Sequence, residues 1–115
     1  MAKHKKHLFD QDEIDIAETA KALSHPARIK ILKILSQMNV CVCGEIVDLL
    51  PLAQATVSQH LKELKRVNLI QGEIEGPKTC YCIDTASIKK IFEKFQNYFN
   101  EINKECKRSC KTKKK

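Results

Sequence analysis

The middle of the chain combines four consecutive patterns whose order restricts the fold more than any other feature. Residues 45–50 predict a short helix that ends at Pro51, and residues 54–67 predict a longer helix with one apolar face. Two short strands follow over residues 69–75 and 79–83, separated by a Gly-Pro turn. Two helices joined by about three residues make a helix-turn-helix, and the hairpin that follows makes it a winged helix.

Further elements are predicted on both sides of this unit. Asp10 and Glu13 have the spacing of a capping box before a first helix, and Pro26 suits the first turn of a second one. Residues 39–43 are rich in β-branched side chains and predict a short strand, and the last helix should begin between residues 84 and 87. The expected fold is therefore mainly α with a small β-hairpin wing, in the order α-α-β-α-α-β-β-α.

The predicted helix over residues 54–67 carries polar side chains near its start, away from its apolar face. The second helix of a helix-turn-helix presents such donors and acceptors to base edges in the major groove of DNA. The expected base-reading residues are Gln54, Thr56, Ser58, Gln59 and His60, and the expected phosphate-contacting residues are Lys62, Lys65, Arg66 and, in the wing, Lys78. His60 has an alternative role as a structural histidine, and Glu73 and Glu75 in the wing oppose phosphate.

Two segments resemble a known family of regulators. Residues 23–32, Leu-Ser-His-Pro-Ala-Arg-Ile-Lys-Ile-Leu, resemble the second-helix signature of the ArsR/SmtB repressors. Residues 52–64 resemble their recognition helix, and residues 68–83 resemble their wing. The resemblance covers about residues 12–100 and implies a dimeric repressor that binds double-stranded operator DNA until a metal ion or another inducer releases it. The zinc-type site of the family, on its last helix, is not expected, because no histidine lies in that part of this chain.

Charge and length divide the chain into three parts. Lysine and arginine number 21 against 14 acidic residues, and a net charge of +7 favours a polyanionic partner. We expect residues 1–9 to be a flexible basic arm and residues 10–103 to be the DNA-binding and dimerisation domain. Residues 104–115 hold seven of the basic residues and two cysteines. This tail either adds salt-sensitive attraction to DNA or is only a solubilising end.

The chain shows no sequence feature of a membrane or secreted protein. No apolar run approaches the roughly 18 residues that a membrane span needs, and no secretory signal is recognisable at the start. We therefore expect a cytoplasmic protein with no membrane partner.

The predicted last helix has an unusually aromatic apolar face. Four of the six aromatic residues lie between Phe92 and Phe99, which is more than a terminal helix needs on so small a core. We expect this face to pack against a second copy and against the first helix, which gives a symmetric dimer. Packing within one chain is the alternative. The expected interface residues are Ile88, Ile91, Phe92, Phe95, Tyr98, Phe99 and Ile102.

Six cysteines form three close pairs, which are Cys41 with Cys43, Cys80 with Cys82, and Cys106 with Cys110. Alternate residues of a strand share a face, so two Cys-x-Cys strands in one sheet bring four thiolates together if their parities match. Tyr81 and Ile83 look like core residues, which predicts that Cys80 and Cys82 point outward. Each pair has a structural alternative, because cysteine is also a common small core residue.

Residues 40–43 resemble the Cys-Val-Cys sequence of the arsenic- and antimony-sensing branch of the family, but Ile46 replaces its third cysteine. A third thiolate must therefore come from elsewhere. The expected metal ligands are Cys41, Cys43, Cys80 and Cys82, with Cys106 and Cys110 less favoured. The expected inducer is As(III) or Sb(III), with Zn(II) or another soft metal as alternative, and no permanent cofactor is expected.

Two function classes remain open. One is a repressor released by a soft metal or metalloid, and the other is a thiol-redox or persulfide-responsive regulator on the same scaffold. An oxidoreductase is not expected, because the chain has no Cys-x-x-Cys motif, no Gly-rich cofactor loop and no paired carboxylate site.

Overall fold

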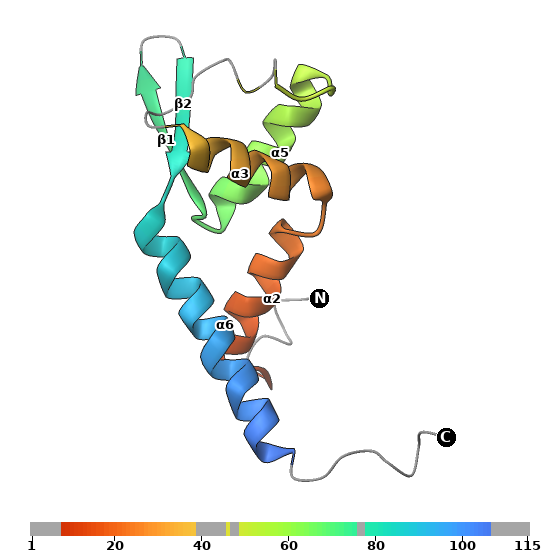
Figure 1. Cartoon of the computed structure of the whole chain (residues 1–115), viewed down its shortest axis with the longest axis vertical. Helices are drawn as coiled ribbons and strands as arrows, with labels where there is room; N and C mark the ends of the chain where they lie inside the picture. The colour runs from red at the N-terminus through yellow and green to blue at the C-terminus, as the bar shows by residue number, and fades with distance from the viewer. Residues whose placement is uncertain (1–7, 39–45, 47–48, 76–77, 107–115) are drawn as a thin grey trace, which may run out of the picture.

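The computed structural model describes residues 8–38, 46, 49–75 and 78–106. Within these residues the chain forms four helices and one antiparallel pair of strands (Figure 1). The helices are α2 (Gln11–Ala22), α3 (Pro26–Gln37), α5 (Gln54–Arg66) and α6 (Thr85–Glu105), and the strands are β1 (Ile70–Glu75) and β2 (Lys78–Ile83). We call α3, α5, β1 and β2 the head of the molecule, and α2 with α6 its shaft.

This arrangement confirms the mainly α fold with a hairpin wing. The expected strand over residues 39–43 and most of the short helix over residues 45–50 lie outside the described residues. Ile46, from the second of these segments, is helical and almost fully buried. None of the helices in the described part of the chain combines the length and apolar character that a membrane crossing requires.

Local interactions begin the helices where the sequence predicted. The amide of Glu13 donates to Oδ1 of Asp10 at 2.9 Å, and the amide of Asp10 donates back to Oε1 of Glu13 at 3.1 Å, which completes the capping box. Pro26 occupies the first turn of α3, where it sacrifices no hydrogen bond. Asp84 caps α6 by accepting from the amide of Ser87 at 3.1 Å.

The hydrophobic core lies in the head, between α3, α5 and the start of β1. The largest fully buried side chains are Val57, Leu64, Leu69, Ile70, Ile31 and Ile46. The first turns of α6 cover one edge of this core through Ile88 and Ile91. The recognition helix predicted from the sequence is thus held by its apolar face, which leaves the opposite face toward solvent.

A short connection joins α5 directly to the wing. Asn68 adopts a left-handed backbone conformation with φ of 66°, which asparagine tolerates better than most residues. The amide of the buried Leu69 donates to the carbonyl of Leu64 at 3.1 Å, and the amide of Asp84 donates to the carbonyl of Leu69 at 3.1 Å. The end of the recognition helix and the start of the hairpin are therefore fixed to each other through the backbone.

The wing corrects one expectation about cysteine orientation. Tyr81 and Ile83 pack against the core, as predicted. Cys80, however, is only 2% exposed and Cys82 is half-buried, so the prediction that both point outward to solvent is wrong. The low exposure of Cys80, on the strand face opposite Tyr81 and Ile83, means that alternation along β2 does not separate a core side from a solvent side.

The shaft is held by polar contacts between its two helices. Tyr98 Oη donates to Oε2 of Glu13 at 2.6 Å, a bond that raises the pKa of Tyr98 to about 12. Lys94 Nζ donates to Oδ2 of Asp15 at 2.6 Å, which holds the pKa of that carboxyl below its ordinary value. These bonds fix α6 alongside α2 (Figure 1).

Candidate nucleic-acid interface

The outer face of α5 presents the polar residues expected to read DNA. Gln54, Thr56, Ser58 and Gln59 are all exposed, while Val57, Leu61 and Leu64 on the other face are buried. Ala53 precedes the helix and has no side chain that can cap it, so the amides of the first turn are left for solvent or a ligand. The start of α5 therefore offers donors and acceptors on one accessible surface.

His60 does not belong to that surface, and the expectation that it faces the major groove is wrong. Its side chain is only 6% exposed, because residue 60 falls three positions after Val57 and four before Leu64, on the buried face of the helix. Nδ1 of His60 accepts from Nε of Arg28 at 3.0 Å. Burial lowers the pKa of His60 below its ordinary value, and electrostatic interactions with His25 and Arg28 lower it further. Because Nδ1 accepts a hydrogen bond, that nitrogen carries no proton.

The basic residues of α5 divide into two kinds. Lys62 and Lys65 are exposed and suit phosphate contacts. Arg66 instead pairs with Glu18 at 2.7 Å and with Glu63 at 3.2 Å, and the bond to Glu18 raises its pKa. Its charge is therefore compensated within the chain.

Lys78, expected at the tip of the wing, is the first residue of β2 and stands opposite Glu75 in the strand register. The backbone register therefore places the expected basic residue of the wing beside an acidic one, and its role in contacting phosphate stays a prediction.

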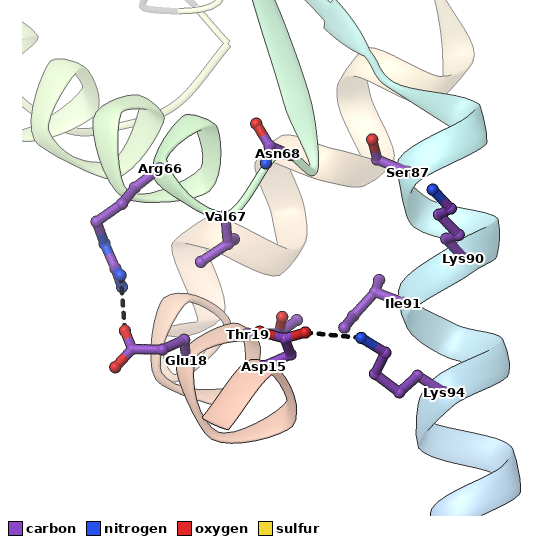
Figure 2. Close-up of a pocket in the computed structure, with 10 residues that line it drawn as sticks. All are labelled: Asp15, Glu18, Thr19, Arg66, Val67, Asn68, Ser87, Lys90, Ile91 and Lys94. Carbon is purple, nitrogen blue, oxygen red and sulfur yellow. Dashed lines mark hydrogen bonds and ion pairs between the residues drawn. The ribbon is translucent and has the colours of Figure 1, made fainter. Parts of the chain in front are cut away.

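A pocket of about 530 Å³ lies between α2, α6 and the C-terminal end of α5 (Figure 2). On one side of it Arg66 reaches Glu18, and on the other side Lys94 reaches Asp15. Both ion pairs connect α2 to a neighbouring helix. We interpret this pocket as the joint between the head and the shaft, because its acidic groups are each paired with a basic group.

The structure describes three of the six cysteines that were expected as metal ligands, Cys80, Cys82 and Cys106. Cys41, Cys43 and Cys110 lie outside the described residues. Cys80 and Cys82 are disulfide-bonded, and a sulfur atom in a disulfide is not available as a thiolate ligand. Cys106 is exposed at the end of α6, and no three metal-binding side chains come together within the described residues.

The aromatic face of α6 is also divided. Ile88 and Ile91 pack against the core of the head, and Tyr98 bonds to α2, so these expected interface residues have partners within the chain. Three others remain accessible, with exposures of 41% for Phe92, 50% for Phe99 and 47% for Ile102. Phe95 lies between Phe92 and Phe99, with ring centroids 5.1 Å and 6.3 Å away.

Sequence reasoning missed Arg28 and Glu18, which hold α5 in place from α3 and α2. Arg28 is 32 residues from His60, and Glu18 is 48 residues from Arg66. A single sequence carries no periodicity that reports such distant pairs. The one available indication was the position of His60 on the apolar side of its helix, which favours a buried partner.

The fold and the exposed polar face of α5 define a winged helix-turn-helix protein. A profile of the family described as "Bacterial regulatory protein, arsR family" matches residues 25–71. A Staphylococcus aureus protein described as "Cadmium resistance transcriptional regulatory protein CadC homolog" is 35% identical over 91 residues, which cover 78% of this chain and 74% of that protein. An uncharacterized HTH-type transcriptional regulator of Methanocaldococcus jannaschii is 37% identical over 78 residues, covering 67% of this chain and 86% of that one.

Solved structures agree with these relatives. An ArsR-like transcriptional regulator from Rhodococcus sp. RHA1 superposes with a TM-score of 0.67 at 20% identity, over 81% of this chain and 87% of that one. A homodimeric winged helix-turn-helix DNA-binding domain from Mycobacterium bovis superposes with a TM-score of 0.58 at 25% identity, over 83% and 87% of the two chains. The chain belongs to the ArsR family, and it is a transcriptional regulator with a DNA-binding winged helix-turn-helix domain.

Proposed function

We propose that this regulator is a dimeric repressor that binds a two-fold symmetric operator and is released when a soft metal or metalloid ion binds its cysteine thiolates. The observation that carries the DNA-binding part is the division of α5 into a buried apolar face and an exposed polar face. In this proposal Gln54, Thr56, Ser58 and Gln59 contact base edges, and Lys62 and Lys65 contact phosphates.

The dimeric part of the proposal rests on α6. Phe92, Phe99 and Ile102 form an exposed apolar stripe on a helix whose polar contacts to α2 use another side. A symmetric pair of such stripes brings two copies together with their heads apart. Two recognition helices then reach half-sites about one helical turn, roughly 34–36 Å, apart. The homodimeric state in the description of the Mycobacterium bovis relative supports this arrangement.

The inducer part of the proposal rests on the thiol chemistry of the chain. Cys41 and Cys43 are alternate residues just before the helix-turn-helix, and the wing supplies Cys80 and Cys82 as candidates for a third thiolate once they are reduced. Thiolates select soft ions, and the Staphylococcus aureus relative is described as a cadmium resistance regulator. We therefore propose As(III), Sb(III) or Cd(II) as the inducer class, ahead of Zn(II).

The disulfide-bonded state of Cys80 and Cys82 favours a second candidate function, a thiol-redox or persulfide-responsive regulator. In that case oxidation of the cysteines, with the oxidant or persulfide as electron acceptor, replaces ion binding as the event that releases DNA. The DNA-binding and dimeric parts of the proposal are the same in both cases.

The DNA-binding part is tested by selecting operators from random duplex DNA with the purified protein. Gln59→Ala should lower affinity for the selected sequence about tenfold more than affinity for unrelated DNA, because it removes a base contact. Lys65→Ala should weaken binding to both sequences alike and reduce the salt dependence by about one ion. Asn97→Ala, an exposed amide on α6, is the matched control. Equal effects of Gln59→Ala on both DNAs would contradict the assignment.

The inducer part is tested on the protein–DNA complex by separate anaerobic titrations with arsenite, Cd(II), Zn(II) and a persulfide donor. Cys41→Ser with Cys43→Ser should leave DNA affinity intact and abolish release by the soft ions. A 100-fold weakening of DNA binding requires only about 2.7 kcal/mol of coupling. Cys106→Ser with Cys110→Ser is the control and should still be released. Release of the reduced protein by the persulfide donor alone would instead establish the second candidate.

A further inference from the structure

A single guanidinium group joins three helices behind the recognition surface. Nε of Arg28, in the first turn of α3, donates to Nδ1 of His60 on the buried face of α5 at 3.0 Å. Nη1 of the same side chain donates to the carbonyl of Ala22 at 3.2 Å and to that of Lys21 at 3.4 Å. Those carbonyls belong to the last turn of α2, where helix acceptors lack partners within their own helix. Arg28 therefore binds the end of α2, where Ser24 also donates to the carbonyl of Lys21, while it holds the middle of α5.

The bond to His60 has a directional character that the surrounding contacts lack. Leu61 and Leu64 hold α5 by apolar packing, which decides the face that the helix buries but is non-directional and tolerates small rotations and shifts. The planar fork of an arginine fixes the direction of each of its bonds. The His60 ring is held further by the His25 ring, whose centroid lies 4.6 Å away. The polar contact from α3 therefore adds a directional constraint on the rotation and height of α5 to the apolar packing.

Arg28 also links the recognition helix to the shaft, through its bond to the end of α2. α2, whose end is bonded to Arg28, is fixed to α6 by Tyr98 and Lys94. In the proposed dimer α6 supplies the contact between the two copies. A continuous chain of hydrogen bonds therefore runs from α6 through α2 and Arg28 to His60 in the recognition helix.

We propose that Arg28 is a positioning residue for operator recognition, which sets the recognition helix relative to the shaft through buried His60 and thereby fixes the separation of the two recognition helices in the dimer. This inference rests on the proposed function as an operator-binding dimer. It assigns His60 to the buried side of the recognition helix, where, among the described residues, its hydrogen-bond partner is Arg28.

The contact requires a neutral His60 ring, because a protonated Nδ1 donates and no longer accepts. The groups that face the ring are His25 and Arg28 from α3, and the adjoining pocket adds Lys21 from α2 together with Glu63 and Arg66 from α5. Glu63 and Arg66 pair with each other. The nearest charges are therefore positive, and protonation at low pH sets His60 against Arg28 instead of binding it.

Two substitutions of His60 separate positioning from mere packing. His60→Asn keeps an acceptor, because the amide oxygen takes the place of Nδ1, whereas His60→Leu keeps the volume and removes the acceptor. The probes are the duplex that the wild-type protein selects and the same duplex with five base pairs inserted between its half-sites. His60→Leu should lose about tenfold of the preference for the native spacing, and His60→Asn should stay within about twofold of wild type.

The pH dependence of DNA affinity gives a second test, which remains usable if His60→Leu fails to fold. Affinity of the wild-type protein for the selected duplex should fall as the pH drops below 6.5, the ordinary value for histidine. The same titration of His60→Asn should lack the loss of affinity that protonation of His60 causes. A wild-type profile that coincides with that of His60→Asn would overturn the inference.

Arg28 itself is tested by a double-mutant cycle. Arg28→Gln should reduce the spacing preference at least as much as His60→Leu does, because it also removes the bonds to the α2 carbonyls. The double variant should lose no more than Arg28→Gln alone, because the bond to His60 is already absent there. Lys33→Gln, an equal change of charge on the exposed side of α3, is the control. Additive losses, or equal loss on both duplexes, would show a structural role only. Failure of the wild-type protein to select any sequence would instead contradict the proposed function.

Discussion

The helices α5 and α6 show how two amphipathic helices of one chain can be used differently. Both carry a clear apolar face in the sequence. In α5 that face is covered by the same chain, with Val57, Leu61 and Leu64 buried. In α6, all of whose residues the structure describes, no side chain is buried, and Phe99 is half exposed. Amphipathic spacing therefore predicts that a face will be covered, but it does not predict by what.

The polar contacts of the two helices explain the difference. α5 has ionic and hydrogen-bonded partners on its inner side, in Arg28 and Glu18, which leave its polar outer side accessible. α6 is attached to α2 through Lys94 and Tyr98, which lie on one side of the helix. Phe92 and Phe99 project from another side, since each residue advances about 100° around the helix. The free face of α5 is polar and suits DNA, whereas that of α6 is apolar and suits a second copy.

The largest expected difference between the apolar faces of α5 and α6 is in the free energy of unfolding. Leu64→Ala should lower the free energy of unfolding by about 2–5 kcal/mol, because it leaves a cavity in the core of the head. Ile102→Ala, a matched truncation on the exposed face of α6, should cost less than about 1 kcal/mol in protein dilute enough to be monomeric. Urea denaturation measures both. Similar losses would mean that the α6 face is stabilised within its own chain.

The next effect concerns association. Phe99→Glu should raise the dissociation constant of the dimer about 100-fold, equivalent to about 2.7 kcal/mol, because it buries a carboxylate against apolar partners. Asn97→Glu adds the same charge to the other side of α6 and should leave the dimer intact. Sedimentation equilibrium at micromolar concentration decides between them. A dimeric Phe99→Glu protein would place the interface elsewhere.

The smallest effect concerns the bond between the shaft helices. Asp15→Asn should destabilise the fold by less than about 1 kcal/mol at neutral pH, since the pair with Lys94 is about one-third exposed. The folded pKa of Asp15 is lowered, so its contribution is present above the ordinary value of 3.8 and is lost as the pH falls through the folded pKa. Wild type and variant should therefore differ at pH 7 and converge in acid. A constant difference across that range would exclude the ion pair as its cause.

Predictions from the sequence succeeded where the cause is local. The capping box at Asp10, the helix start at Pro26 and the helix end before Asn68 each depend on residues within four positions. The recognition helix and the wing follow from periodicity in the same way. These features defined the fold without any information about distant contacts.

Predictions failed where the outcome depends on what covers a side chain. His60 is a polar residue that shares its helix face with Val57 and Leu64, and its partner Arg28 comes from another helix. Cys80 alternates correctly with Tyr81, yet both sides of β2 are shielded. Neither the identity of the residue nor its spacing reports a covering element, so these two assignments required the structure.

The connection at Asn68 has a consequence for how such proteins diversify. Three residues separate the end of α5 from the start of β1, and backbone bonds to Leu64 and Asp84 hold the last of them, Leu69, in place. An insertion there would change the position of the wing relative to α5. Side-chain replacement on α5 is therefore the change that leaves this geometry intact, and a transplanted α5 and wing would need the α3 residues that cover them, such as Ile31 and Arg28.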